Sequence, residues 1–170
     1  MAFREITPAE LGGDVFTPFR QGMLLTAKAG ERINTMTIGW GALGVMWGKD
    51  VMITAVRPER YTYSLMEESD TFSVELLTAQ DKAKIVYCGR ASGRDVDKIA
   101  ECGFTVQYAE DTPYFEQAQL VFICKKIATP MLHESDFLGD DAIPNRYYDE
   151  KGGNYHKLYF GEILKILVKE

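Results

Sequence analysis

Four basic side chains lie at the starts of two predicted helices, although the chain as a whole carries a net charge of −6. A helix start presents free backbone N–H groups and the positive end of the helix dipole, which together suit an anion. Arg94 falls in a first turn, where a cation opposes the dipole and an acidic residue would be stabilising. The pattern predicts a phosphate site, with solvated surface charges as the alternative. Its residues are Arg57, Arg60, Tyr61 and Thr62 at the first start and Ser92, Gly93, Arg94 and Lys98 at the second.

The strand predicted over residues 34–41 has an unusual small-residue face. Alternation divides its residues into two faces, one with Asn34, Met36, Ile38 and Trp40 and the other with Ile33, Thr35, Thr37 and Gly39. A core strand would carry larger apolar residues on the second face, and a solvent-facing strand would carry charges. We therefore expect this face to leave room for a group that lies against the strand.

Aromatic residues near these segments could supply a flat apolar wall for a ring. Trp40 and Trp47 flank a glycine-rich stretch, whereas Tyr61 and Tyr63 have core packing as their simplest role. His156 comes just before the last predicted strand, where it is either an ordinary polar residue or a hydrogen-bonding group of a site.

Composition excludes several classes of protein. The chain has 170 residues, 46% of them hydrophobic, as expected for one globular domain over residues 1–170. A net charge of −6 disfavours nucleic acid and anionic membrane as partners. Three dispersed cysteines and two histidines predict neither a disulfide framework nor a metal site, and reduced thiols indicate a cytoplasmic protein.

No catalytic residue is predicted from the motifs. The chain lacks a P-loop, a Gly-x-Ser-x-Gly elbow and a Gly-x-Gly-x-x-Gly fingerprint. The adjacent acids Glu67 and Glu68 are expected on a solvated helix face rather than as an acid/base pair. The first ten residues contain no apolar signal segment, and no apolar run is long enough to cross a bilayer.

Hydrophobic periodicity predicts a mainly β fold. Strands are expected over 22–28, 34–41, 50–57, 71–77, 104–110, 118–129 and 159–169, and helices over 58–69, 80–88 and 92–101. The last helix begins with a capping box formed by Ser92 and Asp95. The glycine-rich stretch 41–48 is expected to be a loop, and residues 131–156 a long polar loop of the kind that forms lids or partner contacts. Short connections favour an antiparallel sheet that closes as a barrel, with a few short helices.

Four segments in this order resemble the flavin reductase-like family with its FMN-binding split barrel, and in particular its flavoredoxin-like branch. The segments are NTMTIGWG, VRPERYTYSLMEESDTFSVELL, CGRASGRDVDK and YHKLYFGEI, and the similarity extends from about Gly22 to Glu162. Gly39 departs from the pattern, because many relatives have a serine there.

The resemblance implies FMN as cofactor and assigns roles to the four segments. The strand with Asn34, Thr35, Met36, Thr37 and Trp40 would run along the flavin, and its backbone would hydrogen-bond the ring. The segments 57–62 and 92–98 would lie at the phosphate, and the segment with His156 and Tyr159 would lie close to the flavin. The resemblance also implies a homodimer with FMN near the interface, so that part of the site could come from the second chain.

The expected activity is reduction of flavin by NAD(P)H, with the nicotinamide entering the flavin cleft because the chain has no separate dinucleotide motif. Two other functions remain open. One is an electron carrier that holds FMN tightly and exchanges electrons with a protein partner. The other is a non-catalytic flavin-binding or interaction module that has kept the fold.

Overall fold

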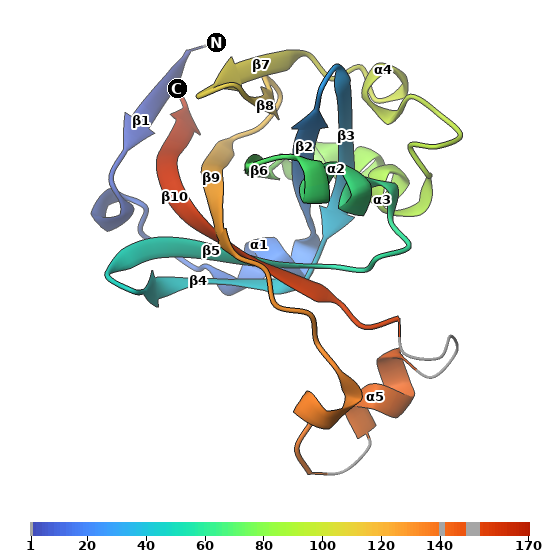
Figure 1. The fold of residues 1–170 in the computed structure, drawn as a ribbon. Helices are drawn as coiled ribbons and strands as arrows, with labels where there is room; N and C mark the ends of the chain where they lie inside the picture. The colour runs from blue at the N-terminus through green and yellow to red at the C-terminus, as the bar shows by residue number, and fades with distance from the viewer. Residues whose placement is uncertain (1, 140–141, 149–153) are drawn as a thin grey trace.

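An antiparallel sheet forms the body of the domain and coils into a barrel (Figure 1). The computed structural model describes residues 2–139, 142–148 and 154–170. Within this part of the chain the main sheet has the order β3-β2-β6-β9-β10-β5-β4, with β1 paired to β10, and β7 and β8 form a separate hairpin. These pairings confirm the predicted mainly β, antiparallel architecture.

The described elements are short apart from the last strand. The strands are β1 (Phe3–Ile6), β2 (Met23–Ala29), β3 (Arg32–Ile38), β4 (Gly41–Met46), β5 (Lys49–Val56), β6 (Thr71–Leu76), β7 (Val106–Ala109), β8 (Thr112–Phe115), β9 (Leu120–Ala128) and β10 (Lys157–Lys169). The helices are α1 (Phe16–Gln21), α2 (Tyr61–Glu68), α3 (Lys82–Arg90), α4 (Lys98–Glu101) and α5 (Ala142–Tyr147).

Strand β10 joins the two halves of the sheet. Its first part, from Lys157 to Glu162, pairs with β5, while most of its length pairs with β9 on the other side. Its final residues pair with β1. The register with β9 shifts next to Gly161 and again next to Leu164, and such irregularities let one long strand bend round a barrel.

Two apolar cores follow from the alternation of β2. Leu25 and the residues two positions away from it on either side face the barrel interior together with Phe72. Leu24 faces the opposite side, together with Ile85 and Phe115. The first core fills the barrel. The second core lies between the sheet and the elements α3, α4 and β8, so it fixes these elements against the outside of the barrel.

The stretch 41–48 is not the loop that was predicted. It forms strand β4, which pairs with β5 along its whole length, and a turn at Trp47-Gly48. A Cβ atom on Gly41 would lie 2.5 Å from both the Ile53 carbonyl oxygen and the Phe19 ring. The glycine therefore lets β4 approach β5 and helix α1 closely.

The helix predicted over 92–101 is also wrong in its first half. Residues 92–96 form turns, and α4 begins only at Lys98. Asp97 is the capping residue, because its carboxylate accepts hydrogen bonds from the backbone N–H groups of Ile99 and Ala100, both at 3.0 Å. Ser92 instead accepts a bond from the backbone N–H of Arg94, at 3.2 Å.

Several elements were not predicted at all. They are β1, α1, β8 and α5, and the described part of the segment 131–156, which contains α5, projects away from the barrel (Figure 1). Part of that predicted loop, residues 140–141 and 149–153, lies outside the described residues. Among the residues that are described, no helix is long and apolar enough to cross a membrane.

Candidate functional site

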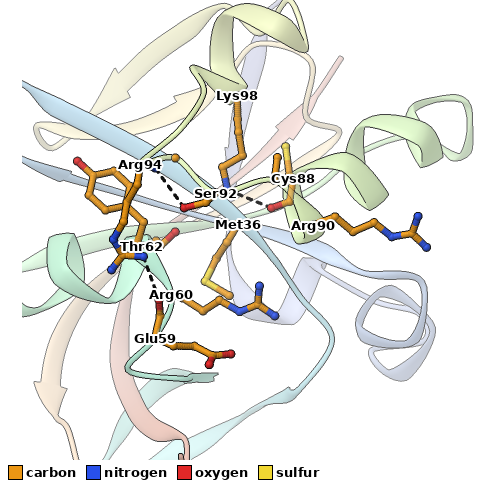
Figure 2. A pocket seen from close by; sticks show the side chains of 12 residues that line it. Met36, Glu59, Arg60, Thr62, Cys88, Arg90, Ser92, Arg94 and Lys98 are labelled. Atoms are coloured by element: carbon orange, nitrogen blue, oxygen red, sulfur yellow. Dashed lines mark hydrogen bonds between the residues drawn. The ribbon is translucent and has the colours of Figure 1, made fainter.

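A cavity of about 280 Å³ lies where β3, the start of α2, the end of α3 and the turns before α4 meet (Figure 2). We call it the basic cavity, because four of its twelve lining residues are Arg or Lys. Its lining residues are Met36, Glu59, Arg60, Tyr61, Thr62, Cys88, Arg90, Ala91, Ser92, Gly93, Arg94 and Lys98. The two segments predicted to bind phosphate are thus brought together in space, although they are separated by strand β6 and helix α3 in the chain.

Lys98 is the most deeply placed cation of this cavity. Only 3% of its surface is exposed, and its Nζ donates a hydrogen bond to the Cys88 carbonyl oxygen at 3.0 Å. Burial lowers the pKa of Lys98, and the nearby Arg60 guanidinium contributes to the lowering. An ammonium group has three hydrogens to donate, and its charge is costly to bury without a counter-charge. An anion in the basic cavity would provide both the acceptors and the charge.

Two arginines are held at the same cavity by backbone carbonyl groups. Arg94 Nη1 donates to the Glu59 carbonyl oxygen at 3.0 Å, and the Arg94 guanidinium lies 5.3 Å from the centre of the Tyr61 ring. Arg60 Nη1 donates to the Gly89 carbonyl oxygen at 3.2 Å. Each guanidinium has five N–H donors, so these bonds orient the groups and leave further donors for a ligand.

The turn with Gly93 packs tightly against β3 and α2. A Cβ atom at Gly93 would lie 2.1 Å from Asn34 Oδ1 and 2.8 Å from a ring carbon of Tyr61. Asn34 is itself fixed, because its Nδ2 donates to Thr62 Oγ1 at 2.7 Å. Only glycine fits here, and this close packing sets the position of the neighbouring Ser92 and Arg94.

A second cavity, of about 210 Å³, adjoins the first and shares Met36 and Arg60 with it. We call it the aromatic cavity, because Trp40 and His156 lie in its wall with their ring centres 4.7 Å apart. It lies where β3 and β5 approach each other without pairing. Its lining residues are Met36, Thr37, Ile38, Gly39, Trp40, Ala55, Arg57, Arg60 and His156.

His156 in this cavity is a neutral hydrogen-bonding group. Burial and the charges of Arg57 and Arg60 lower its pKa to about 4. Its Nδ1 lies 2.8 Å from the hydroxyl of Tyr148, and burial raises the pKa of that hydroxyl, which keeps it protonated. The neutral ring of His156 and the hydroxyl of Tyr148 therefore share one hydrogen bond, in which either group can be the donor.

Arg57 is positioned by the projecting segment. Its Nη2 donates to the Tyr147 carbonyl oxygen at 2.6 Å, and its guanidinium lies 5.3 Å from the centre of the Tyr148 ring. Trp40 also meets this segment, with its ring 5.1 Å from the ring of Tyr147 in an edge-to-face arrangement. The end of α5 therefore forms part of the support of the aromatic cavity.

Most residues predicted to contact a cofactor reach one of the two cavities. They are Met36, Thr37, Trp40, Arg57, Arg60, Tyr61, Thr62, Ser92, Gly93, Arg94, Lys98 and His156. Asn34 lines a third cavity, of about 490 Å³, on the other side of the 92–98 turns, which Lys98 also lines.

Thr35 and Tyr159 do not lie where a cofactor contact would need them. Thr35 is fully buried, accepting a bond from Thr26 Oγ1 at 3.0 Å and donating to the Leu25 carbonyl oxygen at 3.2 Å. Tyr159 is fully buried in the barrel core and donates to Glu67 at 2.6 Å. A ligand has no surface of either residue to touch, so the site proposed below leaves both out.

Helix α3 packs on much of the small-residue face of β3, and only Thr37 and Gly39 of this face line the aromatic cavity. Thr37 Oγ1 hydrogen-bonds the Ile85 carbonyl oxygen, and a Cβ atom at Gly89 would lie 3.2 Å from Thr37 Cβ. The small side chain of Thr37 therefore lets the helix approach the strand. The opposite face, with Met36, is the one that reaches both cavities.

Sequence reasoning missed several residues of the site. Glu59, Cys88, Arg90 and Ala91 line the basic cavity, and Tyr148 holds His156. Arg90 could have been found from the sequence, because it lies two residues before Ser92 in a segment that also contains Arg94. In Figure 2 its guanidinium points away from Lys98 and Arg94. No cluster of three or more potential metal ligands occurs in the described part of the chain.

Comparison with known proteins identifies a matching family and one related protein. The family described as flavin reductase like domain matches residues 20–170. An uncharacterised protein of Aeropyrum pernix is 27% identical over 135 residues, which are 77% of this chain and 51% of that protein, so the chain spans about half the length of this curated relative.

Solved structures of several other proteins share the fold. Flavoredoxin from Methanosarcina acetivorans is 24% identical with a TM-score of 0.67, and the match covers 88% of this chain and 68% of that chain. The FMN-binding protein from Thermus thermophilus is 18% identical with a TM-score of 0.66, and the match covers 88% and 71%. The barrel described above is a split barrel of this type, and the chain belongs to the flavin reductase-like domain family.

Proposed function

We propose that this domain binds FMN, with the phosphate in the basic cavity and the ring in the aromatic cavity, and that it reduces flavin with electrons from NAD(P)H. The buried ammonium of Lys98 carries the proposal, because an acidic protein has placed a nearly inaccessible cation in the wall of a cavity. A phosphate dianion satisfies this group, and the adjoining cavity offers the aromatic wall that a flat ring needs.

The residues present fit the parts of FMN. Lys98, Arg60 and Arg94 offer charged donors to the phosphate, and Ser92 offers a hydroxyl in the same wall. In the aromatic cavity, Trp40 offers an apolar wall to the ring, and neutral His156 offers a hydrogen-bonding group held in place by Tyr148. FMN, when bound, supplies the hydride and electron chemistry, and the protein supplies position and electrostatics.

A reductase must pass electrons from the nicotinamide to the bound flavin, so the test is whether NADH or NADPH reduces the flavin in the protein. We expect the purified protein to be yellow, and rapid mixing with NADH or NADPH to bleach the flavin absorbance near its visible maximum. Buffer without nucleotide is the control. If neither nucleotide bleaches the bound flavin within the turnover time of a reductase, the reductase activity is refuted.

Structural likeness to a flavoredoxin supports an electron carrier as the second candidate. A carrier would keep FMN through purification and would exchange electrons with a protein partner without turning over NAD(P)H. Yellow protein that does not react with either nucleotide would favour the carrier. Colourless protein whose melting temperature does not change with FMN would contradict both redox functions and would favour a non-catalytic module.

A second copy of this chain is the proposed partner at the edge strand β4. The strand ends the sheet, and large apolar side chains along it and its turn are open to solvent, with Val45 69% and Trp47 65% exposed. Trp40, at the mouth of the aromatic cavity, is 43% exposed. We expect light scattering to give the mass of a dimer, and the Val45→Lys/Trp47→Glu variant to be monomeric. A monomeric unmodified protein would contradict this partner.

A further inference from the structure

Two cysteines of different helices lie side by side beneath the basic cavity. The Sγ atoms of Cys88, on α3, and Cys102, which follows α4, are 3.8 Å apart. Both thiols are buried in the second apolar core, and Cys88 also lines the basic cavity. A disulfide has its sulfur atoms about 2.0 Å apart, so a displacement of about 2 Å would join them.

The segment between the two cysteines forms half of the cavity wall. Six of the twelve lining residues fall within residues 89–101, namely Arg90, Ala91, Ser92, Gly93, Arg94 and Lys98. Lys98 is linked to both cysteines. Its Nζ donates to the Cys88 carbonyl oxygen and its own carbonyl accepts from the Cys102 N–H, both at 3.0 Å. A backbone movement that brings the two cysteines together therefore displaces the buried cation, because both of these bonds are to backbone atoms of the cysteines.

We propose that Cys88 and Cys102 form a reversible disulfide that weakens phosphate binding in the basic cavity. This inference rests on the proposed flavin function for the identity of the ligand, but not for the bond itself. Contraction between α3 and α4 changes the position of the Lys98 ammonium relative to Arg60 and Ser92. A charge-assisted bond to phosphate depends strongly on that geometry, so the oxidised protein binds the anion less tightly.

The oxidant is a peroxide, which is small enough to enter through the basic cavity. The Cys88 thiolate attacks one peroxide oxygen, the O–O bond breaks, and hydroxide leaves and takes up the proton lost by the thiol. The resulting sulfenic acid is attacked by the Cys102 sulfur, the S–S bond forms, and a second water leaves. Overall, two thiols lose two electrons and two protons, and one peroxide becomes two waters.

Burial and the neighbouring Cys102 raise the pKa of the Cys88 thiol to about 12. The thiolate is the reacting form, so the reaction is slow at neutral pH and becomes faster as the pH rises. The third cysteine, Cys124, lies fully buried in the barrel core and provides a matched control.

The test compares thiol number with flavin affinity. After hydrogen peroxide treatment we expect the protein and its Cys124→Ser variant each to lose two thiols, and a dithiol reductant to restore them. The Cys88→Ser and Cys102→Ser variants form no intramolecular bond. Oxidation should weaken FMN binding about tenfold and leave riboflavin binding unchanged. By linkage, saturating FMN then shifts the potential of the pair by about 30 mV in favour of the dithiol.

Two results would overturn the proposal. One is retention of all three thiols in the folded protein under peroxide, and the other is a disulfide that leaves the ratio of FMN to riboflavin affinity unchanged. If the reduced protein binds no flavin, the proposed function fails, and inorganic phosphate replaces FMN in the comparison. A phosphate-dependent rise in melting temperature that oxidation abolishes would support the switch. A rise that oxidation leaves unchanged would refute it.

Discussion

Replacing Lys98 and Arg60 together with alanine should weaken FMN binding at least a hundredfold and riboflavin binding far less. FMN and riboflavin differ only by the phosphate, and these two cations lie in the wall of the basic cavity. Hydrogen bonds to charged groups contribute about 1.5 to 3 kcal/mol each, so losing two corresponds to at least about a hundredfold in the dissociation constant. Fluorescence titration with each flavin measures both constants.

The matched control removes the same charge elsewhere. Arg20 and Lys82 line a separate cavity beside α1 and α3, and the Arg20→Ala/Lys82→Ala variant changes the net charge equally. It should bind both flavins as the unmodified protein does. Because Lys98 is buried, Lys98→Met in the double variant preserves its packed stem and separates misfolding from lost charge. Equal losses for FMN and riboflavin would refute the phosphate assignment.

The sequence was enough to predict most of the residues that form the basic cavity, but not the backbone conformation that positions them. The unusual placement of Arg94 and Lys98 in an acidic chain was enough to nominate a phosphate site. The predicted helix start at Ser92 was wrong, because Asp97 competes successfully for the capping position and leaves 92–96 as turns. Local preferences at neighbouring positions differ by too little to settle such a choice without tertiary packing.

The strands followed the alternation of apolar residues closely, and the exceptions have physical causes. Strand β4 is mostly exposed on both faces and rich in glycine, so it carries no alternating pattern, and its pairing with β5 defines it. The small residues Thr35 and Thr37 predict room for a ligand, but Thr35 is buried against Thr26 and Thr37 is half-buried against helix α3. A small residue indicates close approach, and only the fold reveals what approaches.

The candidate site forms where the sheet fails to close. Strands β3 and β5 meet there without pairing, and they line the aromatic cavity with Met36 from β3 and Ala55 from β5. Strand β10 delivers His156 to the same place, just before its first residue. Every cation of the basic cavity comes from a segment that packs on β3, so the position of that strand governs both cavities.

The second large effect concerns a buried carboxyl group outside the site. Glu75, on β6, is fully buried, with Oε1 2.7 Å from Ser73 Oγ and Oε2 3.3 Å from the backbone nitrogen of Phe115. The Ser73 hydroxyl also lies 2.7 Å from the Pro113 carbonyl oxygen. One hydroxyl hydrogen cannot serve both oxygens. When Ser73 donates to Pro113, a protonated Glu75 donates to Ser73, and all three groups are satisfied.

This arrangement makes the stability of the protein fall as the pH rises. Burial raises the pKa of Glu75 to about 7, above its ordinary value of 4.5. Between these two values the folded state holds a proton that the unfolded state has lost, so the free energy of unfolding decreases with pH and levels off above about 7. The full decrease is about 3 kcal/mol.

The Glu75→Gln variant removes this titration and keeps the hydrogen-bonding shape, since the amide can donate to Ser73 and accept from Phe115. Urea unfolding at about pH 5 and about pH 8 should therefore show a smaller loss of stability in the variant, which becomes the more stable protein at the higher pH.

His156 titrates in the opposite sense, because its pKa is lowered to about 4. Its contribution is the same in both proteins and cancels in the comparison. Identical pH dependence in the two proteins would show that Glu75 is ionised in the folded state, and would contradict the neutral hydrogen-bonded acid that the geometry requires.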